Sequence, residues 1–173
     1  MLYERIINTP VSPSEIRDIQ RIVKGIQFAK LYQLIRNVSH EFQIEVADSN
    51  VLRALLEAVS EKYAPDKLYF TFRVKAKDVV VYMHQNDSNY YAERNYLAKF
   101  ISSYIQFADD KGCGLERSWS IPPDIEISSF EAIFSQLYLD GEFNFNRLSS
   151  KAIVSKWLEK VELLSEDPPS LSI

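Results

Sequence analysis

Residues 14–40 of this chain have the pattern of one long helix whose apolar face changes sides partway along. At 100° per residue, the apolar side chains of the first half fall on one side and those of the second half on the opposite side. The first set is Ile16, Ile19, Ile22, Val23, Ile26 and Ala29, and the second is Phe28, Leu31, Tyr32 and Ile35. The change comes near Gly25. A straight helix would need partners on two opposite flanks, whereas a break at Gly25 would let both halves face one core, and the sequence leaves both arrangements open.

Four further helices are predicted from apolar residues at three- and four-residue spacing, with capping residues at their starts. They cover residues 51–64, residues from about 90 to 110, a short segment after Ser128, and a last segment after Ser149. Ser128 and Glu131 have the spacing of a capping box, which supports a helix start at that point.

Four segments are predicted to be strands. Residues 68–74, 115–121 and 142–147 alternate apolar and polar side chains, which is typical of strands with one buried face, although the last segment is short and is either a strand or an extended connection. Residues 79–84 are instead a nearly continuous apolar run rich in β-branched residues. The short connection 75–78 predicts that residues 68–74 and 79–84 form a hairpin. The predicted fold class is therefore α+β, with a small mixed or antiparallel sheet of three to four strands covered by about five helices, of which the N-terminal one is long.

The chain has 173 residues, of which 46% are hydrophobic and 25% are charged, a composition that suits one compact domain. We expect a single domain over residues 1–165 and a short frayed tail over residues 166–173. Cys113 is the one cysteine, so no disulfide forms within the chain. The longest apolar run, residues 79–83, is too short for a membrane span, and no signal-like segment opens the chain. The expected location is cytoplasmic.

Charge is distributed unevenly along the chain. The formal net charge is −4, and a sequence pI near 5.3 argues against a general nucleic-acid or anionic-membrane binder. Residues 1–40, however, carry six basic and three acidic residues, a net of +3, and the remaining residues carry 14 and 21, a net of −7. A basic N-terminal element on an acidic body is the expected arrangement.

Motifs for metals, cofactors and common catalytic machinery are absent from the sequence. His40 and His84 are the two histidines, and neither has the spacing of a zinc site. With four glycines, the chain contains no phosphate-cradling loop and no nucleophile elbow. We expect no cofactor and no metal.

A Cys–His dyad is the one enzymatic alternative that the sequence offers. Cys113 lies between two glycines, and His84 ends a predicted strand beside Asp87. The two meet if the strand at 115 runs antiparallel beside the strand at 79, and they lie apart if the intervening helix is a crossover between parallel strands. Long helical connections favour the second arrangement.

The candidate contact residues are basic and aromatic. Arg17, Arg21 and Lys24 share one face of the first helix. The outward side of the predicted hairpin supplies Tyr69, Arg73, Lys75 and Lys77, and the start of the following helix supplies Tyr90 and Tyr91. Aromatic residues favour protein interfaces, so the expected function is a non-enzymatic binding or accessory subunit that docks on a larger protein assembly. The alternatives are a nucleic-acid-contacting subunit that uses the basic helix face and a small Cys-dependent enzyme.

Overall fold

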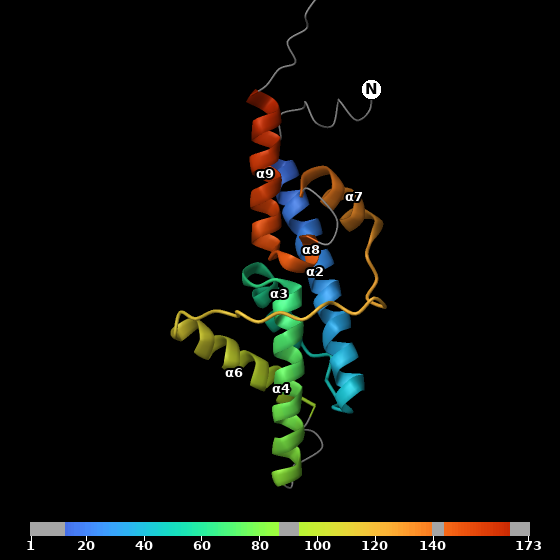
Figure 1. Cartoon of the computed structure of the whole chain (residues 1–173), viewed down its shortest axis with the longest axis vertical. Helices are drawn as coiled ribbons and strands as arrows, with labels where there is room; N and C mark the ends of the chain where they lie inside the picture. Colours follow the sequence, from blue (N-terminus) through green and yellow to red (C-terminus); the bar gives the residue numbers. More distant parts are fainter. Residues whose placement is uncertain (1–12, 87–93, 140–143, 167–173) are drawn as a thin grey trace, which may run out of the picture.

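The computed structural model describes residues 13–86, 94–139 and 144–166, and in these ranges the chain forms helices and no strands (Figure 1). The helices are α2 (Pro13–Phe42), α3 (Asn50–Lys62), α4 (Pro65–Gln85), α6 (Tyr96–Asp110), α7 (Ser129–Tyr138), α8 (Asn144–Arg147) and α9 (Ser150–Glu166). The prediction of an α+β fold with a small sheet is therefore wrong. The single-domain prediction stays a prediction, and the predicted tail lies outside the described residues apart from Glu166, which ends α9.

Helix α2 is continuous through Gly25 and packs against a different set of helices along each half. Its first half contributes Val23 to a core shared with α7, α8 and α9, and its second half contributes Leu31 and Leu34 to a core shared with α3, α4 and α6. Figure 1 shows α7, α8 and α9 around one end of α2 and α3, α4 and α6 toward the other. Of the two arrangements that the sequence left open, the chain adopts the helix with partners on two flanks.

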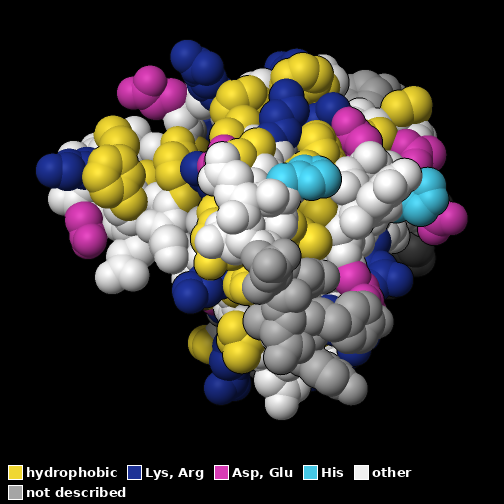
Figure 2. Space-filling view, turned by 90° about the horizontal axis from the view of Figure 1, so that it is seen from below, with side chains coloured by type: hydrophobic (Ala, Val, Ile, Leu, Met, Phe, Trp, Pro, Cys, Tyr) yellow, Lys and Arg dark blue, Asp and Glu magenta, His cyan; other side chains and the backbone are white. Residues whose placement is uncertain are grey.

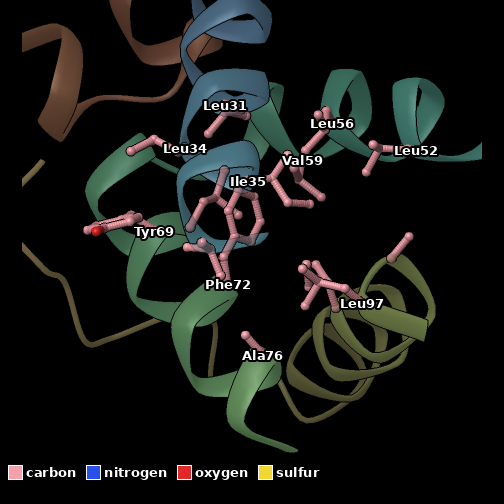
Figure 3. Close-up of a cluster of buried hydrophobic side chains, with 14 of the residues drawn as sticks. Leu31, Leu34, Ile35, Leu52, Leu56, Val59, Tyr69, Phe72, Ala76 and Leu97 are labelled. Atoms are coloured by element: carbon pink, nitrogen blue, oxygen red, sulfur yellow. The ribbon is translucent and has the colours of Figure 1, made fainter. Parts of the chain in front are cut away.

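The first core fills the space between α2, α3, α4 and α6 (Figure 3). Ile35 of α2, Leu56 of α3 and Phe72 of α4 point toward one another at its centre, and Leu97 of α6 closes one side. Leu56 and Phe72 have no exposed surface. Burial of this many large apolar side chains is the main favourable term in folding this half of the chain.

The second core is smaller and more aromatic. Phe134 of α7 contacts Phe145 of α8 edge to face, with ring centroids 5.9 Å apart, and lies 6.5 Å from the ring of Trp157 of α9. Val23 and Ile153 are fully buried beside them. Ser128 and Ser149 begin α7 and α9 as predicted, because each side-chain oxygen accepts a hydrogen bond from a backbone N–H three residues later.

The predicted hairpin at residues 68–84 is a single helix, α4. Pro65, which follows the helix predicted for residues 51–64, begins α4, because proline is well tolerated in the first turn of a helix. The apolar residues of this segment fit both periods, since Leu68, Phe72, Ala76 and Val79 also form a helical stripe, and all four are buried. Packing of that stripe against α2 and α6 favours the helix over the strand. Alternation of apolar and polar residues alone is therefore not enough to predict a strand in this segment.

The other two predicted strands are also wrong. Residues 111–128 form an extended connection, here called the strap, that crosses α4 and α2 between α6 and α7 (Figure 1). With 68–84 helical, residues 115–121 have no neighbouring strand, and Trp119 N–H instead donates to the Asp66 carbonyl at 3.1 Å. Residues 144–147 of the fourth predicted strand form α8, which buries Phe145, and residues 142–143 lie outside the described ranges.

Gly25 offers a direct test of the uninterrupted α2 helix. A Cβ built at this position meets no atom within 4 Å. Gly25→Ala is therefore expected to raise the free energy of unfolding by about 0.5–1 kcal/mol, because glycine is a poor helix former. Gly112→Ala is the matched control. Its Cβ also meets nothing, but its φ of +65° disfavours any side chain. Urea denaturation should show opposite signs for the two variants, and destabilisation by Gly25→Ala would contradict a regular helix at residue 25.

Candidate functional site

The three basic residues predicted on the first helix line one side of a groove between α2 and α3. The groove has a volume of about 500 Å³, and Gly25 and Phe28 line it together with Arg17, Arg21 and Lys24. All three cations are exposed, because the second core takes the opposite flank of this half of α2. The structure thus brings these three predicted site residues together, and we call the feature the basic groove.

The opposite wall of the basic groove is acidic. Glu57 and Glu61 of α3 line it, and Lys24 forms an ion pair with Glu61 at 2.5 Å across the groove. Arg21 pairs within its own helix with Asp18 at 3.2 Å, with its side chain 81% exposed. Exposed pairs of this kind contribute little to stability. Arg17 has no ion pair within the described residues, so its guanidinium is available to a partner.

The four predicted contact residues on α4 do not extend this surface. Tyr69 is buried, and its hydroxyl points away from the centre of the first core (Figure 3). Arg73 donates to that hydroxyl at 3.0 Å and lies over the Trp119 ring, 5.0 Å from its centroid. Lys75 pairs with Asp78 and lies over a tyrosine ring of α6, while Lys77 is exposed. Arg73 therefore holds the strap against α4.

Tyr90 and Tyr91, the remaining predicted contacts, lie outside the described residues.

A layer of buried polar residues separates the two cores, and sequence reasoning missed it. Lys30 of α2 donates to Glu131 of α7 and, at 2.6 Å, to Oδ1 of Asn146 of α8. One turn earlier, Gln27 donates to the backbone carbonyl of Phe145 at 2.8 Å. Ser60, Ser135 and Ser150 are also buried, and the Ser150 hydroxyl donates to the Ser60 carbonyl at 3.1 Å.

Burial of charged and polar groups in this layer costs free energy unless each group has a partner. Lys30 and Glu131 each expose 3% of their surface. Burial lowers the pKa of Lys30, and the hydrogen bond and charge of Glu131 act in the opposite direction. Glu131 Oε2, Gln27 Oε1 and Ser135 Oγ are buried without a hydrogen-bond partner among the described residues. A buried ion pair adds little net stability compared with apolar packing, but removal of one partner alone is costly. The signal was present, because Gln27 and Lys30 interrupt the helical stripe Val23, Leu31, Leu34.

Cys113 and His84 are not brought together. His84 is in the last turn of α4, and Cys113 follows the far end of α6, which leads away from α4 (Figure 1). Figure 2 views the end of the molecule that carries both imidazoles, and they lie apart among side chains of both charges. Among the described residues no group of three or more His, Cys, Asp and Glu side chains could hold a metal ion.

The chain has no match among protein-family models, curated proteins or solved structures. Within the described ranges, none of the helices is both long and apolar enough to span a bilayer. The arrangement of side chains is therefore the basis for a functional proposal.

Proposed function

We propose that this protein is a non-enzymatic accessory subunit and that the basic groove docks an acidic segment of another protein. The observation that carries the proposal is the gathering of Arg17, Arg21 and Lys24 on one exposed flank of α2 beside a half-buried Phe28. These cations belong to the N-terminal +3 region of a chain whose remainder carries −7. A partner segment with carboxylates beside an apolar side chain is complementary to this flank.

A protein partner suits the basic groove better than nucleic acid does. Glu57 and Glu61 form the wall of the basic groove that faces the three cations. Carboxylates at that position repel a phosphate backbone, whereas a protein segment can offer acidic groups to α2 and donors to α3. The net charge of −4 points the same way.

Replacing Arg17, Arg21 and Lys24 together by Glu should leave the fold intact and remove docking. Each substitution is on an exposed position, so each is expected to change stability by only a few tenths of a kcal/mol. The control is the triple replacement Lys99→Glu, Lys151→Glu and Lys156→Glu, which makes the same charge change on exposed residues of α6 and α9.

Docking is measured by photocrosslinking in the native host from a crosslinker at Gln20, an exposed residue of the groove. We expect one crosslinked protein that the control triple variant keeps and the groove triple variant loses. The crosslinked segment should be rich in Asp and Glu. Equal crosslinking by both variants would contradict docking at the groove. A crosslink to nucleic acid, lost in the groove variant, would replace this proposal with the nucleic-acid alternative.

A further inference from the structure

A second hollow lies on another side of the molecule, beneath the strap. It has a volume of about 620 Å³, and its walls are the middle of α2, the start of α4, the strap and α8. The residues that matter for its chemistry are Lys30, Asp66, Trp119, Ile127, Asn146 and Arg147. This volume lies within the range of small-molecule sites in proteins. None of these residues belongs to the basic groove.

The deep wall of the hollow presents hydrogen-bond donors that are not fully used. Lys30 carries three N–H donors and uses two, on Glu131 and on Asn146 Oδ1. Because Asn146 accepts through Oδ1, its NH₂ group remains a donor, and no described residue accepts from it. Lys30 and Asn146 are both buried, yet both line the hollow. Unused donors on the wall of a hollow favour a ligand that brings an acceptor oxygen.

The outer walls are apolar and carry one charge of each sign. Trp119 and Ile127 are about half exposed, 51% and 50%, and both line the hollow. Asp66 stands at the start of α4, where burial raises the pKa of its carboxyl group, and Arg147 is an exposed cation that acts to lower it. The outer walls of the hollow therefore offer the Trp119 ring and the Ile127 side chain to the apolar body of a ligand.

We propose that the hollow binds a small carboxylic acid with an apolar body about the size of one aromatic ring. The carboxylate accepts hydrogen bonds from Lys30 and Asn146, and the body lies against Trp119 and Ile127. A carboxylate is preferred to a neutral carbonyl because hydrogen bonds to an ionised acceptor are about twice as strong. An amine is disfavoured, because it cannot accept from the donors at the deep wall.

The two tryptophans make a direct NMR test practical. Trp119 lines the hollow, whereas Trp157 is buried in the second core, so the full chain gives two indole N–H resonances in different surroundings. Phenylacetate is the probe, with phenylacetamide and phenethylamine as its neutral and cationic counterparts. We expect phenylacetate to shift the Trp119 resonance in a saturable way and to leave that of Trp157 in place. Phenylacetamide should bind at least several-fold more weakly, and phenethylamine should not bind.

Three variants and one control variant make the test sharper. Asp66→Asn is expected to tighten phenylacetate binding and Arg147→Gln to weaken it, each about 2–5-fold, because a charge at a partly exposed site contributes up to about 1 kcal/mol. Ser120→Phe, at an exposed position of the hollow, should abolish the shift by filling the space, whereas Ser102→Phe on the outer face of α6 should have no effect. No saturable shift with phenylacetate, equal affinity for phenylacetamide, or unchanged binding by Ser120→Phe would each overturn the proposal.

Discussion

Replacing Lys30 by Met is expected to lower the free energy of unfolding by about 3–5 kcal/mol, because it leaves the carboxylate of Glu131 buried without its partner. Glu131→Met should cost a similar amount, since it leaves the ammonium group bonded to Asn146 alone. The double variant Lys30→Met with Glu131→Met removes both charges and keeps apolar volume in their place. It is expected to recover more than half of either loss.

Urea denaturation of the four proteins gives the interaction energy between Lys30 and Glu131. A single-variant loss below about 1 kcal/mol, or a double-variant loss equal to the sum of the two singles, would show that the two groups do not form a buried pair. Either result would contradict the polar layer as the joint between the two cores.

Phe72→Ala is expected to lower the free energy of unfolding by about 3–5 kcal/mol, the usual cost of emptying a buried aromatic site. Phe72 has no exposed surface and lies at the centre of the first core (Figure 3). Phe107→Ala on α6 is the control, because that ring is 55% exposed and its removal should change stability by less than about 0.5 kcal/mol. A loss below about 1 kcal/mol for Phe72→Ala would place the core elsewhere.

Helices with one dominant period could be predicted from the sequence, and so could the change of face along α2. The stripe at Ile16, Ile19 and Ile26 and the stripe at Leu31 and Ile35 turned out to face two different cores. That result follows from helix geometry, because a straight helix with apolar residues on opposite flanks needs a partner on each.

The segment 68–84 could not be predicted in the same way. Phe70 and Val74 sustain the alternation of a strand, while Leu68, Phe72 and Ala76 sustain the stripe of a helix. Local pattern cannot choose between the two, because the choice depends on packing against α2, which comes from a distant part of the chain. The strand predicted for residues 115–121 is wrong for a related reason. Its expected pairing partner was the predicted strand at residues 79–84, and that segment is part of α4.

Of the candidate sites, the basic groove was only half predictable. Its three cations follow helical spacing on α2, but Glu57 and Glu61 reach it from α3 through the tertiary fold. The hollow beneath the strap was not predictable, because Lys30, Asp66, Trp119 and Asn146 meet from four separate segments. A charged residue inside an apolar stripe, as Lys30 is, was the one available sign that polar chemistry lies within the fold.

The most direct measurement of the docking proposal is the association rate of the protein crosslinked at Gln20, measured by stopped flow across a range of ionic strength. Steering by Arg17, Arg21 and Lys24 predicts a rate that falls as salt rises, since charge complementarity acts mainly on association. The groove triple variant should show no measurable association, or a much slower one with little salt dependence, while the Lys99, Lys151 and Lys156 control should retain the wild-type slope. The same rate and salt slope for the wild type and the groove variant would contradict the account.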